Sequence, residues 1–111
     1  NMLLEPRGRS TWGWEQNSML TVYPALKKAV TNPEFYVMKH FSRFATPGSV
    51  RVGLKGPWSG NAVAFRAADG TVTLVIANPF GEPRMLTLDH GSAVQSLELE
   101  ASSFHTLLWQ G

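Results

Sequence analysis

The chain has 111 residues, of which 43% are apolar and 16% are charged, and its net charge is +2 at neutral pH. This length supports one modest hydrophobic core, and the composition excludes a disordered tail, a coiled coil or a second full domain. The absence of cysteine excludes disulfides, thiolate zinc sites and cysteine nucleophiles, and no apolar run approaches the roughly 18–20 residues of a transmembrane helix.

The positive charge is concentrated in the first part of the chain. Residues 1–60 contain 8 Lys and Arg against 3 Asp and Glu, whereas residues 61–111 contain 2 against 5. The basic residues are scattered singly apart from Lys27-Lys28, so the sequence contains no compact polybasic patch. Nucleic-acid binding is therefore not predicted.

The first 23 residues are predicted to be mostly irregular. An apolar entry at Met2-Leu3-Leu4 leads into a turn with Pro and Gly, and a loop at residues 12–17 then holds two indoles and two amides. Residues 18–23 have the composition of a short strand, and residues 24–31 are polar enough for a connection.

A helix is predicted from about residue 33 to residue 44. Asn32 offers an N-cap side chain, Pro33 suits the first helical position, and Glu34 suits the positive end of the helix dipole. Apolar residues recur there at helical spacing: Phe35, Val37, Met38, Phe41 and Phe44. Thr46-Pro47-Gly48 is expected to end the helix.

After residue 48 the hydrophobic period changes to the two-residue alternation of strands. Asp69-Gly70 lies between two such segments, residues 62–67 and 71–76, and predicts a hairpin. The other predicted strands are residues 50–54, 84–88, 94–99 and 104–109. Short strands at a spacing of about 10 residues predict an antiparallel β-sandwich, so the fold class is mainly β.

The alternation also assigns strand faces. Val63 and Phe65 should share one face of their strand, and Val72, Leu74 and Ile76 should share one face of the partner strand. Phe65 is on this pattern a candidate core residue.

No catalytic residue is assigned from the residue pattern. Hydrolytic glycoside chemistry needs two carboxyl groups that face one sugar, and the acids before residue 61 are Glu5, Glu15 and Glu34. Glu34 is explained by the start of the helix, and Glu15 is the acid beside the tryptophans. Serines 102 and 103 precede His105 without an acid to orient its imidazole, which favours turn serines over a nucleophile.

The three histidines are far apart in sequence and lack the spacing of metal ligands. The glycines between residues 53 and 60 lack the helix and the Lys-Ser/Thr pair of a phosphate-binding loop. Neither a metal site nor a cofactor is predicted.

The tryptophan loop is the candidate binding site. Pyranose rings present apolar C–H faces that stack on indoles, and amides hydrogen-bond sugar hydroxyls. Trp12, Trp14, Gln16 and Asn17 therefore have the side-chain types of a carbohydrate site. Packing of the same indoles in a core is the alternative explanation.

Three stretches carry a resemblance to a known family. They are NMLLEPRGRSTWGWEQNSMLTV at residues 1–22, NPEFYVMKHFSRFATPGSVRVG at residues 32–53 and FHTLLW at residues 104–109. They resemble glycoside hydrolase family 30, the group of glucosylceramidases and related bacterial glycosidases; the second resembles its final-helix signature and the third its last strand.

The resemblance implies that residues 1–47 are a remnant of a (β/α)8 barrel, with its active-site loop and last helix, and that residues 48–111 form the β-sandwich domain. The acid/base and nucleophile glutamates of the family lie on earlier barrel strands, and no residue here matches either motif. Trp14 and Asn17, with Trp12 nearby, match loop positions that border the sugar pocket. The expected protein is the C-terminal portion of a retaining, glucosylceramidase-like β-glycosidase that supplies one wall of the pocket and is inactive alone.

The resemblance also implies partners. The substrate would be a β-glycoside, in carbohydrate or sphingolipid metabolism, bound together with the barrel portion of the same protein. Family sandwiches also use strands from the N-terminal side of the barrel, which this sequence does not contain. A secreted or extracellular location is compatible with the family, and the resemblance implies no cofactor.

The alternative from another class is a free-standing, non-catalytic β-sandwich module that binds carbohydrate or protein. It requires residues 1–48 to be a packed appendage of the sandwich. Exposure of Phe35, Tyr36 or Phe41 on the helix would indicate a missing barrel, and full burial would favour the module.

Overall fold

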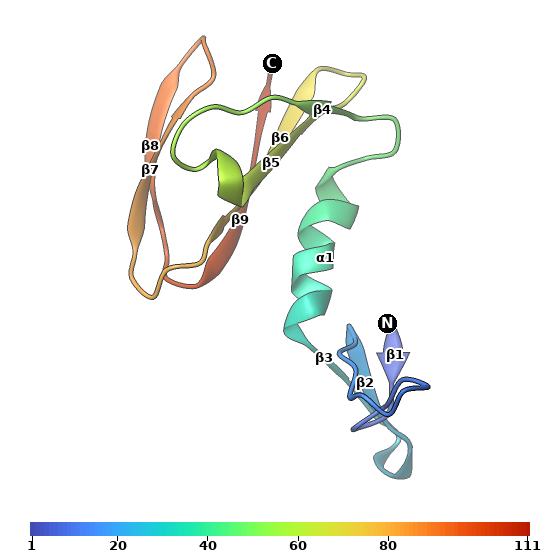
Figure 1. The fold of residues 1–111 in the computed structure, drawn as a ribbon. Coiled ribbons are helices and arrows are strands. Elements are labelled where there is room, and N and C mark those ends of the chain that lie inside the picture. The colour runs from blue at the N-terminus through green and yellow to red at the C-terminus, as the bar shows by residue number, and fades with distance from the viewer. The chain divides into compact units, whose positions relative to one another are not determined.

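The computed structural model describes residues 1–111 and separates them into two units, Asn1–Lys39 and His40–Gly111 (Figure 1). The boundary falls inside the helix, and each unit is described by itself. None of the helices has the length and the apolar character that crossing a bilayer requires.

The first unit contains a three-stranded sheet. Its strands are β1 (Leu3–Leu4), β2 (Leu20–Tyr23) and β3 (Lys28–Thr31). β1 pairs in parallel with β2, and β2 pairs antiparallel with β3. The turn between β2 and β3 is a 3₁₀ helix at Pro24–Leu26, followed by Lys27 in a left-handed conformation.

The prediction of a polar connection over residues 24–31 was wrong in its second half. Val30 and Thr31 are β-branched, and in β3 they pair with Thr21 and Leu20 of β2. Two consecutive β-branched residues after a short turn were the signal for a strand that the polar composition concealed.

The helix α1 (Pro33–Phe44) has the bounds that the sequence predicted. Its start differs in one detail, because the Asn32 side chain bonds to β2 and its flank instead of capping the helix. Asn32 Nδ2 donates to the Ser18 carbonyl oxygen and to Thr21 Oγ1, both at 2.8 Å. The amide of Asn32 therefore ties the start of α1 to the sheet of the first unit.

The second unit is a mainly antiparallel β structure of two sheets. The four-stranded sheet has the order β4-β5-β6-β9, and β7 pairs with β8 in the other. The strands are β4 (Val50–Val52), β5 (Ala62–Arg66), β6 (Thr71–Asn78), β7 (Arg84–Asp89), β8 (Val94–Leu99) and β9 (Ser103–Gln110). All six predicted strands are present, although Leu54 lies beyond the end of β4.

β6 is the central strand of this unit, and residues 72–76 are all buried. Side chains alternate along a strand, so one face of β6 carries Leu74 and Ile76. Ile76 packs with Leu86 of β7 and Leu99 of β8, which places the hydrophobic core between the two sheets.

The other face of β6 lies against the last turn of α1. Thr73 Oγ1 donates to the Phe44 carbonyl oxygen at 3.3 Å. On the same face of β9, Thr106 Oγ1 lies 2.6 Å from His40 Nδ1. The strand is therefore covered on both faces, which agrees with its apolar run from Leu74 to Ala77.

The predicted strand faces are confirmed, but the place of Phe65 differs. The register pairs Phe65 with Thr73 and Ala64 with Leu74. The Phe65 ring therefore lies on the α1 side of the sheet, where it is half-buried, while Ala64 is the β5 residue buried toward the core face. The small Ala64 side chain leaves room for the larger residues of the opposite sheet.

The predicted hairpin at Asp69-Gly70 joins β5 to β6. Gly70 N donates to the Ala67 carbonyl oxygen at 3.0 Å, and Ala67 N donates to the Thr71 carbonyl oxygen at 2.9 Å. Gly70 has a φ of 88°, which a residue with a side chain adopts at a cost. The Asp69 carboxylate accepts a hydrogen bond from Thr71 N at 2.9 Å and so completes the turn.

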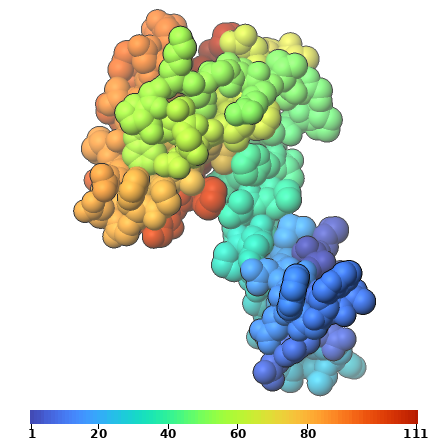
Figure 2. All heavy atoms as spheres, in the orientation of Figure 1, coloured from blue at the N-terminus to red at the C-terminus, as the bar shows by residue number.

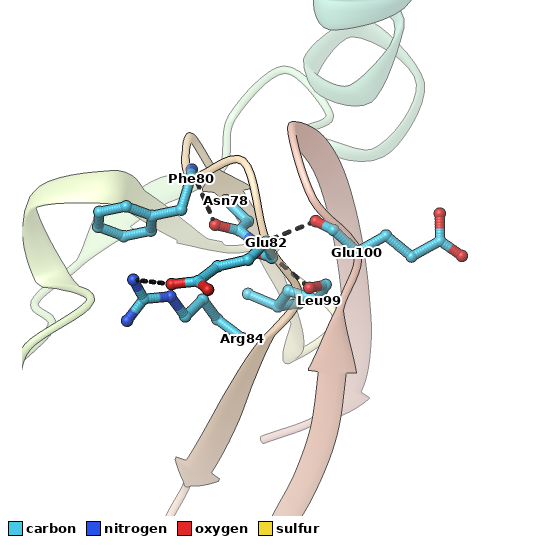
Figure 3. Close-up of polar contacts among 6 residues, drawn as sticks. All are labelled: Asn78, Phe80, Glu82, Arg84, Leu99 and Glu100. Carbon is cyan, nitrogen blue, oxygen red and sulfur yellow. Dashed lines mark hydrogen bonds and ion pairs between the residues drawn. The ribbon is translucent and has the colours of Figure 1, made fainter.

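Asn78 ends β6 and is 1% exposed. Its Nδ2 donates to the carbonyl oxygens of Glu82, Leu99 and Glu100 at 3.0, 3.1 and 2.9 Å, and its Oδ1 accepts from Phe80 N at 3.1 Å (Figure 3). An amide has two N–H bonds, so three carbonyl oxygens share them. This side chain fastens the loop after β6 to the turn between β8 and β9.

Replacing Asn78 should destabilise the second unit strongly. Asn78→Ala leaves the carbonyl oxygens of Leu99 and its neighbours without a donor, and we expect the free energy of unfolding to fall by roughly 2 kcal/mol or more in urea denaturation. Asn78→Asp places carboxylate oxygens against the same carbonyl oxygens, so its free energy of unfolding should fall further than that of Asn78→Ala. This difference should become smaller in acid, where the carboxyl is protonated. Asn61→Ala, whose side chain makes no hydrogen bond, is the control; a change of less than about 0.5 kcal/mol for Asn78→Ala would contradict this assignment.

Asp69 gives the hairpin a pH dependence. The hydrogen bond from the Thr71 backbone N–H, with a second from its side chain, lowers the pKa of the Asp69 carboxyl. Because the folded-state pKa lies below the unfolded value, the stabilisation is present above about pH 4 and is lost as the pH falls through the lowered pKa. Asp69→Asn keeps an acceptor oxygen without titrating, so its denaturation midpoint should fall less than that of the wild type between pH 5 and pH 2. Glu98→Gln controls for the loss of one negative charge. If the denaturation midpoints of the wild type and Asp69→Asn change in parallel with pH, the Asp69 carboxyl does not cause the pH dependence.

Candidate functional site

The candidate site is the tryptophan hairpin, residues 9–15 of the first unit. Arg9 and Glu15 form an antiparallel bridge, Ser10 N donates to the Trp14 carbonyl oxygen, and Gly13 N donates to the Ser10 carbonyl oxygen, both at 2.9 Å. Gly13 has a φ of 81°. This is the backbone pattern of the turn at residues 67–71, so the segment predicted as an irregular loop is an ordered hairpin.

Both indoles of the tryptophan hairpin are exposed. Trp12 is 73% exposed and Trp14 is 68% exposed, whereas Trp58 and Trp109 of the second unit are half-buried. Packing in a core of this chain therefore does not explain Trp12 and Trp14. Their exposure leaves aromatic surface available for stacking on a ligand.

Amide side chains lie just after the tryptophan hairpin. Asn1 Nδ2 donates to Gln16 Oε1 at 3.3 Å and to the Asn17 carbonyl oxygen at 3.5 Å. The amide side chain of Asn17 is exposed, and none of the hydrogen bonds of the structure involves it. Asn17 therefore keeps both a donor and an acceptor for a ligand hydroxyl.

Glu15 is an ion-pair partner within the tryptophan hairpin. Its Oε1 lies 3.6 Å from Arg9 Nη2 and 3.9 Å from Arg7 Nε, and all three side chains are well exposed. No second carboxylate shares these contacts, whereas hydrolysis of a glycoside requires two acids across one bond. Within these contacts Glu15 is thus a partner of two arginines.

The structure also brings Ser103 and His105 together on one face of β9. Ser103 Oγ lies 2.8 Å from His105 Nε2 and donates its proton to the Glu100 carbonyl oxygen. A hydroxyl has one proton, so His105 is the donor in the pair and does not activate the serine as a base. Elsewhere in the chain, no group of three or more His, Asp and Glu lies together as metal ligands would.

An open groove of about 740 Å³ lies in the second unit between residues 53–59 and β7. Figure 2 shows residues 53–59, in yellow-green, against the β7–β8 hairpin, in orange. The groove is lined mainly by apolar side chains that reach the hydrophobic core, with Lys55 and Asp89 among the polar ones. The sequence did not predict it, because it forms between segments that are distant along the chain.

Comparison with known proteins places this chain among the glycoside hydrolases that carry a β-sandwich. The family model "Glycosyl hydrolase family 30 beta sandwich domain" matches residues 48–107. The lysosomal acid glucosylceramidase of Mus musculus is 31% identical over 114 residues, an alignment that covers 99% of this chain and 22% of that protein. The chain belongs to glycosyl hydrolase family 30.

Solved structures agree on the fold. SrfJ from Salmonella typhimurium matches with a TM-score of 0.88 and 25% identity, over 100% of this chain and 25% of that one. The endo-β1,6-glucanase BT3312 matches with a TM-score of 0.78 and 23% identity, over 99% of this chain and 26% of that one. The resemblance to family 30 is thus confirmed, and the chain spans about a quarter or less of the proteins that it matches.

The sequence did not point to two further residues of the tryptophan hairpin. Ser10 and Arg9 bond directly to the turn that carries the indoles. A signal was present in Ser10 and Gly13, because a hydroxyl residue three positions before a glycine is typical of such a turn. This turn signal was not recognised, because residues 5–12 show no regular hydrophobic pattern.

Proposed function

We propose that this chain supplies the β-sandwich and one wall of the sugar pocket of a retaining, glucosylceramidase-like β-glycosidase, and that it is inactive alone. The observation that carries the proposal is the pair of exposed indoles on an ordered hairpin in a family 30 chain. In this reading Trp12 and Trp14 stack on the C–H face of a β-glycoside, and the Asn17 amide bonds a hydroxyl.

Hydrolysis would proceed by double displacement through a covalent glycosyl-enzyme. The two carboxyl groups of such enzymes lie about 5–5.5 Å apart, and we place both on the barrel portion of the parent protein. Glu15 supports this division, because its carboxylate is engaged by Arg9 and Arg7 without a second acid beside it. Residues 1–47 would then be barrel and residues 48–111 sandwich.

Two surfaces support a larger parent protein over a free-standing module. No residue of α1 is buried, and Tyr36 and Met38 are 54% and 52% exposed. Apolar residues such as Leu54, Leu86 and Leu88 line the open groove of the second unit, where strands from the rest of the parent would complete the sandwich.

Sugar binding tests the proposed site. A stacking face and one amide leave most ligand hydroxyls in water, so methyl β-glucoside should bind with a Kd weaker than about 1 mM, near −4 kcal/mol. We expect titration to shift the indole N–H resonances of Trp12 and Trp14 and not those of Trp58 and Trp109. Trp14→Ala should abolish the response.

The control is Leu26→Ala, because Leu26 is 70% exposed in the same unit. This variant should bind as the wild type does. Micromolar binding that survives Trp14→Ala would contradict the placement of the site. The same preparation should release no 4-nitrophenol from an aryl β-glucoside, and turnover that Glu15→Gln abolishes would contradict inactivity.

A further inference from the structure

Three side chains hold the tryptophan hairpin without being candidates for sugar contact. They matter because Trp12 and Trp14 are exposed, so side-chain packing does not fix the backbone between them. Polar contacts within residues 9–15 must do so instead.

Ser10 lies at the centre of these contacts. Its Oγ accepts hydrogen bonds from Trp12 N at 3.2 Å and from Trp14 N at 3.3 Å. Its backbone N–H and carbonyl oxygen bond to Trp14 and Gly13. One side-chain oxygen therefore binds the backbone N–H groups of both tryptophans.

Arg9 and Glu15 brace the same turn from the outside. Arg9 Nη1 donates to the Gly13 carbonyl oxygen at 3.0 Å, and Arg9 Nη2 lies 3.6 Å from Glu15 Oε1. An exposed ion pair of this length contributes little, whereas a hydrogen bond from a charged donor to a carbonyl contributes more. The expected order of importance is Ser10, then Arg9, then Glu15.

We infer that Ser10 and Arg9 are positioning residues that hold Trp12 and Trp14 as a preformed stacking platform. This inference rests on the proposed function, in which the two indoles meet a β-glycoside. A fixed platform binds more tightly than a mobile one because the ordering cost is met before the ligand arrives. Losing the hydroxyl of Ser10 should therefore weaken sugar binding although Ser10 does not touch the sugar.

The test compares Ser10→Ala with Ser10→Thr in two measurements on the full chain. Hydrogen exchange of the Trp12 and Trp14 backbone amides should be faster in Ser10→Ala. The affinity for methyl β-glucoside should fall about fivefold, which corresponds to about 1 kcal/mol for a lost hydrogen bond. Ser10→Thr keeps the hydroxyl and should restore both, and Glu15→Gln should change neither by more than about twofold.

The outcomes separate this inference from the proposed function. Ser10→Ala with unchanged amide exchange and unchanged affinity would overturn the positioning role, as would a loss that Ser10→Thr does not restore. If the indole resonances of Trp12 and Trp14 in the wild-type chain do not shift with methyl β-glucoside, the proposed function is overturned. The hydrogen-exchange measurement would still decide whether Ser10 fixes the hairpin. Unchanged exchange of the backbone amides of β2 and β3 in each variant excludes unfolding of the first unit as the cause.

Discussion

The second unit depends on the burial of β6 on both of its faces. One face contributes Leu74 and Ile76 to the core between the two sheets, and the other faces the end of α1 through Thr73. A polar residue on either face would lose solvation without gaining a partner unless a hydrogen bond compensates it. Thr73 meets this condition by donating to the Phe44 carbonyl oxygen.

The same constraint explains how β6 ends. The strand cannot continue past Pro79, which lacks the N–H of a ladder position. Asn78, the last residue of β6, links the end of the strand to two other segments, because its buried amide donates hydrogen bonds to three of their carbonyl oxygens. The loop after β6 and the turn between β8 and β9 are thus held by one side chain at the end of the central strand.

Local patterns predicted the elements that local interactions determine. Pro33 and the apolar spacing after it gave the bounds of α1, and Asp69-Gly70 gave the hairpin between β5 and β6. The side of the sheet that Phe65 occupies was not predictable, because alternation separates the faces of a strand without saying what covers each one. For β6 the unbroken apolar run from Leu74 to Ala77 was the available sign that both faces are covered.

The sequence indicated the residue types of the candidate site but not the hydrogen bonds that hold its hairpin. Trp12, Trp14 and Asn17 are conspicuous because aromatic and amide side chains are suited to sugars. Ser10 and Arg9 act through backbone contacts within seven residues, and such contacts leave only a faint trace in sequence. The sandwich is thus organised by burial and the tryptophan hairpin by hydrogen bonds. Segments with few packed contacts are expected to open locally at low cost.

Native-state hydrogen exchange of the whole chain tests the central role of β6 most directly. If the strand organises the second unit, the amides of Leu74, Val75 and Ile76 should exchange only through global unfolding and should be the slowest in the chain. The amides of the tryptophan hairpin should exchange faster by local opening. Exchange of the β6 amides at the rate of the β7–β8 amides, or through an opening smaller than global unfolding, would contradict the account.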